Sequence, residues 1–316
     1  MANTDVLGFW KIAEADPDHI AIIDPDYREM TYGELAALTN KIGKGLRALG
    51  LGVGDQVTTV LPNCFEQVAV CLAASQIGLY VTTVVMSLGY HYYDQTARNE
   101  ALWANAIVSR YPMVGKATPN DTGITLDVKG RRVQVFNIHL PDSPYQPYQL
   151  LKIPYGNSAF LTTAAEAEEA ARKARGPGLA LLEADLATAR GADVILITGD
   201  FNEPSHLDWT AAAVAASLHP LIVKWPFTHA LEQAGFIDTF RAAYPDEVEK
   251  PGFTWSPMIK DDDPNNHPDR IDYIFVRGKS VKIKSTAVVG ENSKWTDQVI
   301  EPWPSDHRAV ISVITF

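Results

Sequence analysis

Four short polar segments lie in the C-terminal two-thirds of the sequence, and each accompanies a run of apolar and β-branched residues. They are Asn137–Asp142, Ile197–Pro204, His267–Phe275 and Trp303–Val310. One such segment alone indicates a turn or a cap, because Asp and Asn commonly fill those positions and a lone His is usually structural. Four of them in one chain predict polar side chains that gather where strands end.

The residue types in these segments suit phosphoryl transfer. Hydrolysis of a phosphoester needs a cation to neutralise the phosphoryl oxygens, donors to hold them and a group that activates water. Asp306 can offer the carboxylate oxygen that Mg²⁺ or Mn²⁺ prefers. The adjacent His307 can act as a general base or as a proton donor, and Asp272 is a suitable partner to orient its imidazole.

Asp200 and Asn202 are separated by one residue, so at the end of a strand both side chains can face the same side. The carboxylate accepts hydrogen bonds and the amide can donate them. This pair can therefore hold a nucleophile and a phosphoryl oxygen together.

The order of three motifs, GDFN, DRIDY and a late SDH, resembles the endonuclease/exonuclease/phosphatase family. The resemblance extends to NAIVSRYP at Asn105–Pro112 and FNIHLP at Phe136–Pro141, and it covers about residues 89–316. It implies a four-layer αββα sandwich and a metal-dependent phosphoesterase, a hydrolase that uses Mg²⁺ or Mn²⁺.

Carried over to matching positions, the resemblance implies a set of site residues. His307 would be the catalytic histidine and Asp272 its partner, and Asp306 is similar to the family's late metal-binding Asp. Asp200 and Asn202 match the pair that orients nucleophile and phosphate.

Two further residues have possible phosphate contacts by the same resemblance. His139 resembles a residue at a strand end that contacts phosphate. Arg110 sits where an Arg could face phosphate, although a solvated Arg in a turn before Pro112 is an equally good interpretation.

The opening of that family is not recognisable in this sequence. A complete member begins with a strand that ends in Asn, followed by a strand-to-helix turn that bears a Glu, the principal metal ligand. Before Asn105 only Asp94 and Glu100 could substitute, and ligand geometry tolerates deviations of only about 0.2 Å. We therefore expect an incomplete sandwich and a weakened activity.

The first part of the sequence alternates strand and helix signals. We expect strands at Ile20–Ile23, Gln56–Leu61 and Tyr80–Val85, a helix from Thr31 to Leu49 and a helix at Cys64–Ile77. This βαβαβ order is typical of a parallel, Rossmann-like sheet.

Two stretches of this region, Met30–Glu66 and AASQIGLYVTTV ending at Val84, resemble adenylate-forming acyl-CoA synthetases, over about residues 1–84. In that family they form only the opening layer. None of the family's catalytic motifs is recognisable here, so adenylation is not expected.

These resemblances predict an α/β chain with two parts, an N-terminal fragment at 1–84 and a phosphoesterase-like domain at 85–316. The join, near Val84–Met86, has no linker, which suggests a truncated fusion. The last strand of the sandwich, here Ala309–Phe316, normally pairs with the first strand. Loss of the first strand would therefore leave an exposed apolar edge along Ala309–Phe316.

The elements that must position the polar segments are predicted from periodicity. After the strand that ends at His139 and before the first expected helix of this part, Pro141–Phe160 is either a lid over the site or a surface loop packed by its own aromatic residues. The expected strands are Ala106–Ser109, Gly123–Val128, Arg132–His139, Asp193–Thr198, Ile271–Val276, Val281–Val289 and Ala309–Phe316, and the expected helices are Ala164–Ala174, Leu179–Arg190, Trp209–Ala216 and Thr228–Ala234.

The net charge of the chain limits the class of substrate that it can bind. The formal charge of -11 disfavours duplex nucleic acid as a substrate, because basic surfaces bind it, and favours a small organic phosphoester.

Cys64 and Cys71 are expected to lie about 10 Å apart along one helix, which is too far for a disulfide. The lack of a disulfide and the absence of a leader at Met1–Lys11 together indicate a cytoplasmic protein. The uncharged stretch Gln67–Tyr93 contains too many polar residues for a membrane span. Nothing indicates the oligomeric state.

The leading hypothesis is therefore a metal-dependent phosphoesterase of weakened activity. The alternative is a non-catalytic pseudoenzyme that binds phosphate through His139, Asn202 and His307. A remote third is a fragment of an acyl-adenylate-forming ligase.

Overall fold

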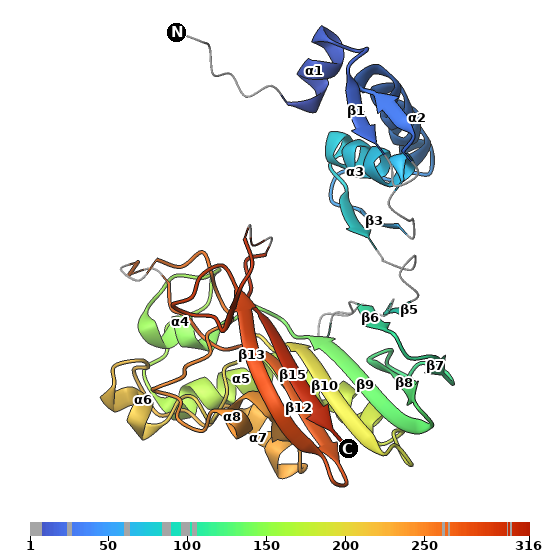
Figure 1. Ribbon diagram of the computed structural model, residues 1–316. Coiled ribbons are helices and arrows are strands. Elements are labelled where there is room, and N and C mark those ends of the chain that lie inside the picture. Colours follow the sequence, from blue (N-terminus) through green and yellow to red (C-terminus); the bar gives the residue numbers. More distant parts are fainter. Residues whose placement is uncertain are drawn as a thin grey trace. The chain divides into compact units, whose positions relative to one another are not determined.

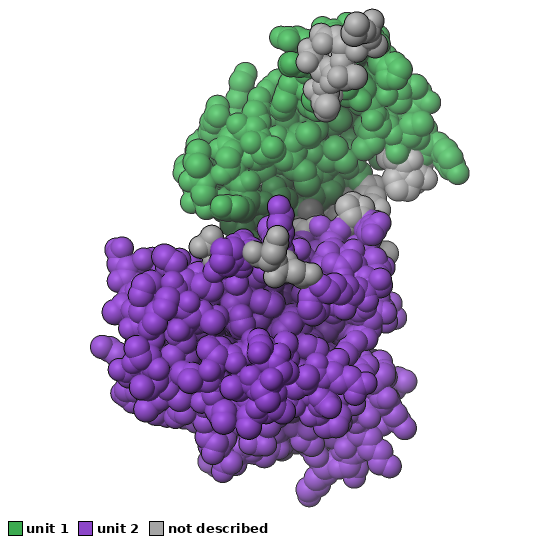
Figure 2. All heavy atoms as spheres, turned by 90° about the vertical axis from the view of Figure 1, so that its left-hand side faces the viewer, with its two compact units in different colours: residues 1–92 green, residues 93–316 purple. Residues whose placement is uncertain are grey.

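The computed structural model describes residues 8–23, 27–59, 64–83, 90–95, 102, 106–260, 263–264, 266–301, 303 and 305–316. It contains two compact units, Met1–Tyr92 and Tyr93–Phe316, which Figure 2 shows in green and purple. The predicted join at Val84–Met86 and the substitute ligand Glu100 lie outside the described residues.

The first unit contains α1 (Phe9–Ala15), β1 (Ile20–Ile23), β2 (Glu29–Thr31), α2 (Tyr32–Ala48), β3 (Gln56–Thr59), α3 (Phe65–Ile77) and β4 (Tyr80–Thr83). β3 and β4 pair in parallel across α3, which confirms that part of the predicted order. The expectation that β1 joins the same sheet is wrong, because it pairs antiparallel with β2. β2 follows β1 closely in sequence, and a short connection favours an antiparallel partner.

Residue Thr31 begins α2 through a reciprocal cap. Its Oγ1 accepts a hydrogen bond from the backbone N–H of Glu34 at 3.2 Å, and the Glu34 carboxylate accepts one from the Thr31 N–H at 2.9 Å. These bonds satisfy two N–H groups that have no partner within the helix. The predicted helix start is therefore confirmed.

The second unit contains a six-stranded sheet and a three-stranded sheet, which Figure 1 shows with their strands. The six strands run in the order β11, β12, β10, β9, β8, β7, and the three in the order β14, β13, β15. A further pair joins β5 (His91–Asp94) to β6 (Ala106–Ser109). The bounds of the larger sheets are β7 (Met113–Val114), β8 (Gly123–Val128), β9 (Arg131–His139), β10 (Val194–Asp200), β11 (Ile237–Asp238), β12 (Asp272–Gly278), β13 (Lys282–Gly290), β14 (Gln298–Val299) and β15 (Ala309–Thr315).

Two apolar cores cover the two faces of the six-stranded sheet. On one face Phe136 and Ile197 pack against Leu182 of α5 and Leu231 of α7. On the other face a second core joins residues of β8, β9, β10 and β12 to residues of β13 and β15. The result is mixed α/β, with a helix layer, a sheet and a second sheet. The helices are α4 (Gln146–Leu151), α5 (Ala164–Leu186), α6 (Ala211–Ala215), α7 (Pro226–Gln233) and α8 (Thr239–Ala243).

One helix prediction is wrong. The expected break between Ala174 and Leu179 does not occur, because α5 continues through Pro177 as one helix of 23 residues. A proline removes one backbone hydrogen bond, and the burial of residues from both halves of α5 offsets that cost. The Tyr- and Pro-rich excursion is also more than a loop, since it contains α4, most of which is buried.

Strand β15 has β13 on one side of it, and among the described strands none on the other. Along β15 exposed residues alternate with partly buried ones, and Ile311 and Val313 are 46% and 51% exposed. This agrees with the predicted apolar edge within the described part of the chain.

Both cysteines are free thiols. Among the described residues, no helix is both long and apolar enough to cross a membrane.

Candidate active site

Three strands present polar residues in one row across the six-stranded sheet. His139, the last residue of β9, pairs in register with Asp200, the last residue of β10. Asp200 pairs in turn with Asp272, the first residue of the antiparallel β12. Adjacent strands lie about 4.8 Å apart, so the backbone itself brings these three side chains together.

The turn after β10 depends on two residues of the GDFN motif. Gly199 has φ +133°, and a Cβ there would lie 1.8 Å from the carbonyl oxygen of Ile138, so only glycine fits. Asn202 has φ +46°, a conformation that Asn tolerates better than most residues. Its amide donates to the Leu140 carbonyl at 2.9 Å and to Asp200 at 3.2 Å, and its backbone N–H donates to Asp200 at 2.8 Å.

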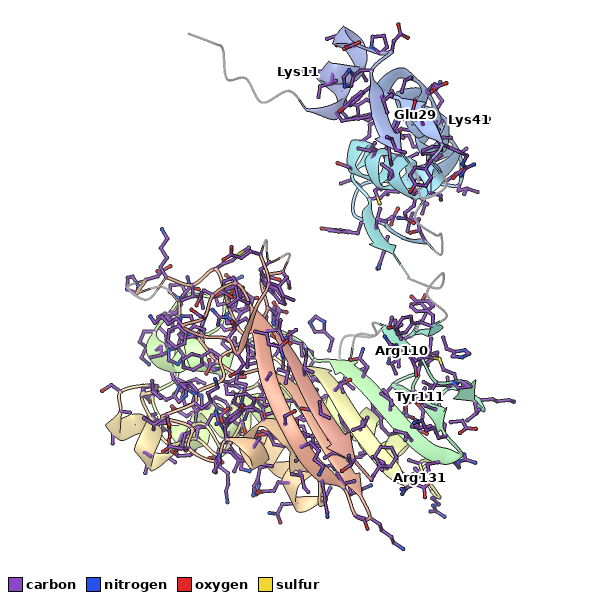
Figure 3. All side chains as sticks on the ribbon, viewed as in Figure 1. Lys11, Glu29, Lys41, Arg110, Tyr111 and Arg131 are labelled. Atoms are coloured by element: carbon purple, nitrogen blue, oxygen red, sulfur yellow. The ribbon has the colours of Figure 1, made fainter. Side chains whose placement is uncertain are left out.

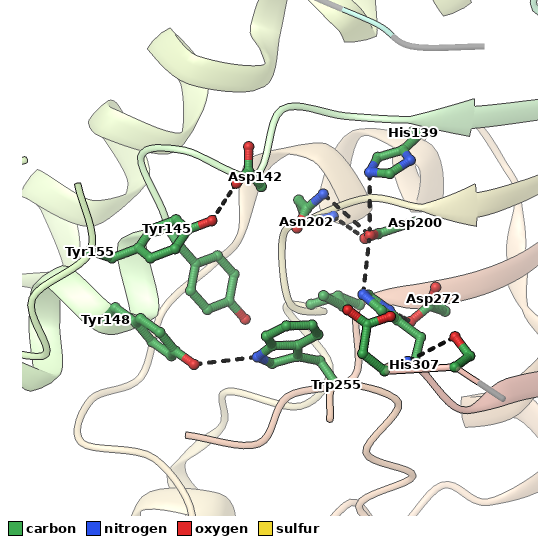
Figure 4. A pocket seen from close by; sticks show the side chains of 13 residues that line it. His139, Asp142, Tyr145, Tyr148, Tyr155, Asp200, Asn202, Trp255, Asp272 and His307 are labelled. Carbon is green, nitrogen blue, oxygen red and sulfur yellow. Dashed lines mark hydrogen bonds and ion pairs between the residues drawn. The ribbon is translucent and has the colours of Figure 1, made fainter. Parts of the chain in front are cut away.

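The side chain of His307 joins this row from the loop before β15. Its Nδ1 lies 2.9 Å from the Asp272 carboxylate, and its Nε2 lies 3.8 Å from the Asp200 carboxylate. His139 approaches the same Asp200 oxygen, with its Nε2 at 3.6 Å. Figure 4 shows the two imidazoles on either side of Asp200. We call Asp200, Asp272 and His307 the pocket cluster.

Burial and neighbouring charges set the protonation of these groups. Burial, together with the negative charge of Asp272, raises the pKa of Asp200 to about 8. For His307, burial opposes the positive charge, but the hydrogen bond and charge of Asp272 outweigh it and raise the pKa to about 9. Burial also lowers the pKa of His139, with the nearby His307 acting in the same direction. At neutral pH His307 is therefore cationic and His139 is neutral.

The row faces a pocket of about 510 Å³. One wall is aromatic: Tyr145, Tyr148 and Trp255 pack with Ile271, and the Trp255 indole donates to the Tyr148 hydroxyl at 3.3 Å. Tyr155 stacks edge-on against Tyr148 and donates to Asp142 (Figure 4). The pocket thus combines a polar floor with an apolar side.

The pocket gathers six of the seven site residues predicted from the sequence. His139, Asp200, Asn202, Asp272, Asp306 and His307 all line it. Asp306 is exposed, and the group of potential metal ligands that forms around Asp200 does not include it. Arg110 is not among the lining residues; it is exposed, directly after β6 (Figure 3).

The donor set of the pocket cluster fits a divalent cation. One ligand atom from each of its members lies within 4.8 Å of the others. Two carboxylates that face the same space repel one another, and a hard cation such as Mg²⁺ or Mn²⁺ binds carboxylate oxygen. Asp94, the other substitute ligand considered from the sequence, ends β5 and is exposed.

Sequence reasoning missed Asp142 as a pocket residue, although it belongs to the same polar segment as His139. Glu203 is 1% exposed, and its carboxylate accepts a hydrogen bond from the Phe227 N–H at 2.7 Å in the first turn of α7. Its position directly after GDFN gave no signal of that contact.

Residues 9–98 match the family model AMP-binding, described as AMP-binding enzyme. The acetoacetyl-coenzyme A synthetase of Rhizobium meliloti (strain 1021) is 41% identical over 49 residues, which are 16% of this chain and 8% of that protein. The chain resembles two families. The N-terminal resemblance predicted from the sequence is to the acyl-CoA synthetases, and the match confirms it.

An uncharacterized protein of Caenorhabditis elegans is 28% identical over 263 residues, which cover 78% of this chain and 81% of that protein. Similar solved structures belong to the second family predicted from the sequence. One is an endonuclease/exonuclease/phosphatase family protein from Leptotrichia buccalis, with a TM-score of 0.41, 14% identity and coverage of 89% of this chain and 94% of that one. Another is the 3' phosphatase NExo from Neisseria bound to a product DNA hairpin, with a TM-score of 0.45, 18% identity and coverage of 73% and 81%.

Proposed function

We propose that the second unit is a metal-dependent phosphoesterase with an incomplete αββα sandwich of the endonuclease/exonuclease/phosphatase type. The observation that carries the proposal is the in-register row of His139, Asp200 and Asp272, completed by the hydrogen bond between Asp272 and His307. Such a row offers proton acceptors and donors within reach of one phosphorus atom.

In this proposal His307 and Asp200 have opposite tasks. His307 is held cationic by Asp272, so its Nε2 can donate to a phosphoryl oxygen while charge accumulates there. Asp200 lies 3.8 Å from that nitrogen, and its raised pKa makes the deprotonated form a stronger base than an exposed carboxylate. The deprotonated carboxylate accepts a proton from the attacking water as the new P–O bond forms. The P–O bond to the leaving group breaks, and the leaving oxygen takes up a proton from solvent. The Asn202 amide orients the Asp200 carboxylate through its 3.2 Å hydrogen bond.

A divalent ion, Mg²⁺ or Mn²⁺, would be held by the carboxylates of the pocket, with Asp306 at its rim, and would neutralise phosphoryl charge. The family's principal ligand, a Glu, is not recognisable in the sequence. We therefore propose that turnover is slow.

The substrate proposed is a small organic phosphoester. A pocket of about 510 Å³ lies in the usual size range for small-molecule sites. The aromatic wall of Tyr148, Tyr155 and Trp255 offers an apolar surface to the organic part of the substrate. The acidity of the chain disfavours duplex nucleic acid.

The test is hydrolysis of bis-p-nitrophenyl phosphate by the full chain with Mg²⁺ or Mn²⁺. We expect slow turnover that chelation removes and that His307→Ala lowers by roughly 100-fold or more. Ser305→Ala, which changes another residue of the pocket lining, serves as the control and is expected to keep most of the rate.

Two outcomes would contradict the proposal. If His307→Ala retains the rate, the hydrolysis does not come from this site. If the wild-type chain shows no turnover yet binds a phosphate ester by calorimetry, the pseudoenzyme alternative is correct; an absence of both turnover and binding excludes both. Release of pyrophosphate from ATP would instead support the remote ligase alternative.

A further inference from the structure

A second group of metal-ligating side chains lies outside the pocket cluster. It consists of His219, His267 and Asp269, which we call the buried cluster. Their side chains are 3%, 14% and 1% exposed. His219 lies in the loop between α6 and α7, whereas His267 and Asp269 precede β12. Segments about 50 residues apart in sequence therefore meet through three polar groups.

The distances within the buried cluster suit a shared cation. Nδ1 of His219 lies 3.0 Å from Nε2 of His267, and each nitrogen lies 3.9 Å from the same oxygen of Asp269. A distance of 3.9 Å is too long for a hydrogen bond. Two ligands of a tetrahedral ion with bonds of 2.0–2.1 Å are about 3.3 Å apart, so shifts of a few tenths of an ångström would complete the geometry.

The carboxylate of Asp269 is already oriented by two donors. The Tyr145 hydroxyl donates to one oxygen at 2.7 Å, and the Trp209 indole donates to the other at 3.1 Å. The Trp209 ring also stacks on His219, with centroids 4.4 Å apart and planes 13° apart. Outer contacts of this kind fix the orientation of metal ligands and raise affinity.

The ligand types select the metal. Two imidazole nitrogens and one carboxylate suit Zn²⁺, whereas Mg²⁺ prefers oxygen and retains water. His267 also lines a separate pocket of about 390 Å³ next to Asn266 and Ser256, from which solvent can supply a fourth ligand.

We infer that the buried cluster is a zinc site, with His219 Nδ1, His267 Nε2 and one oxygen of Asp269 as its protein ligands. The inference does not depend on the proposed phosphoesterase activity. Through Asp269 the ion would also brace Tyr145, which forms part of the aromatic pocket wall. The role assigned is structural, since the ligands are buried and hold two distant segments together.

The test uses the full chain, stripped with a chelator and then incubated with Zn²⁺ in excess Mg²⁺. Zinc retained after gel filtration is counted by mass spectrometry, and Co²⁺ is used as a second probe because tetrahedral Co²⁺ absorbs visible light strongly. We expect one zinc per chain, tetrahedral Co²⁺ absorption and an increased melting temperature with zinc.

Variants locate the site. His219→Asn and His267→Asn are each expected to weaken zinc binding by roughly 100-fold or more. His206→Asn is the matched control, because His206 is another shielded histidine with a carboxylate partner, Glu232 at 2.9 Å, and it should keep the zinc. Asp200→Asn should keep it as well, since the pocket cluster is a separate group.

A stripped wild-type chain that takes up no zinc overturns the inference, whether or not the variants fold. Zinc that His219→Asn and His267→Asn both retain overturns it as well. Zinc lost only from Asp200→Asn would assign the ion to the pocket cluster instead.

Discussion

The pocket cluster and the buried cluster are built from the same residue types but differ in their surroundings. The pocket cluster has two carboxylates and one imidazole, with side chains between 13% and 24% exposed, and it faces a cavity of about 510 Å³. The buried cluster has one carboxylate and two imidazoles, and its carboxylate is 1% exposed.

The two clusters differ in whether their polar atoms face a cavity, as a reaction requires, or are bonded within the protein, as a structural role requires. In the pocket cluster the short contact is between a carboxylate and an imidazole, which leaves Asp200 and the Nε2 of His307 facing the cavity. In the buried cluster the carboxylate receives its hydrogen bonds from Tyr145 and Trp209, so its oxygens are engaged within the protein. Residue identity alone does not distinguish the two; solvent access and partners do.

The largest expected effect is on activity in the pocket cluster. Asp200→Asn removes the proposed base while keeping the shape of the side chain, so kcat should fall roughly 1000-fold. Its melting temperature should change little, because the lost acceptor for the Asn202 amide is offset by the removal of a carboxyl group that burial disfavours when charged. Steady-state rates and thermal melts would check both. A stable variant with full activity would contradict the role of Asp200.

In the buried cluster we expect the opposite result, a loss of stability with little loss of activity. Asp269→Asn removes one acceptor oxygen of a buried side chain that both Tyr145 and Trp209 contact, so the free energy of unfolding should fall by about 1–3 kcal/mol. Activity should change less than tenfold, because the side chain does not line the pocket. Denaturant unfolding beside steady-state rates would measure the two. A loss of activity without a loss of stability would contradict the comparison.

The smallest effect is on the pH dependence of stability in the metal-free chain. Folding raises the pKa of Asp200 to about 8 and that of His307 to about 9. As pH rises, the contribution of Asp200 to stability therefore declines from about pH 4 to 8, and that of His307 from about pH 6.5 to 9. In the buried cluster, burial lowers the pKa of His219 to about 3 and that of His267 to about 4. Their contribution is present above pH 6.5 and is lost as pH falls toward 4.

Melting temperatures from pH 4.5 to 9 in a chelating buffer would measure these slopes. His307→Asn should flatten the slope above pH 6.5 and His219→Asn the slope below it, each by a few degrees, since about 1 kcal/mol corresponds to roughly 2–4 °C for a chain of this size. If either variant altered the slope assigned to the other cluster, the comparison would fail.

Much of the site could be predicted because strand ends and their motifs are local in sequence. GDFN predicted polar side chains at the end of a strand, where the structure has a turn that needs glycine at 199, and the strand ends at His139 and Asp272 followed from apolar runs. The capped start of α2 at Thr31 was also visible as a short pattern. Each of these depends on residues within about ten positions of one another.

What could not be predicted depends on packing between distant segments. The continuity of α5 through Pro177 follows from burial along both halves of the helix. The meeting of His219 with Asp269 depends on loops 50 positions apart, and no spacing rule joins them. Arg110 was proposed from the family resemblance, but it is exposed and is not among the described residues that line the pocket.

The central claim is that side chains between His139 and His307 hold one phosphate and one divalent ion. The most direct measurement is a crystal structure of the full chain grown with Mn²⁺ and inorganic phosphate. We expect an anomalous manganese peak about 2.1 Å from a carboxylate of the pocket, and phosphate oxygens in hydrogen-bond contact with Asn202 and His307. Manganese and phosphate bound elsewhere, with this pocket holding only water, would contradict the account.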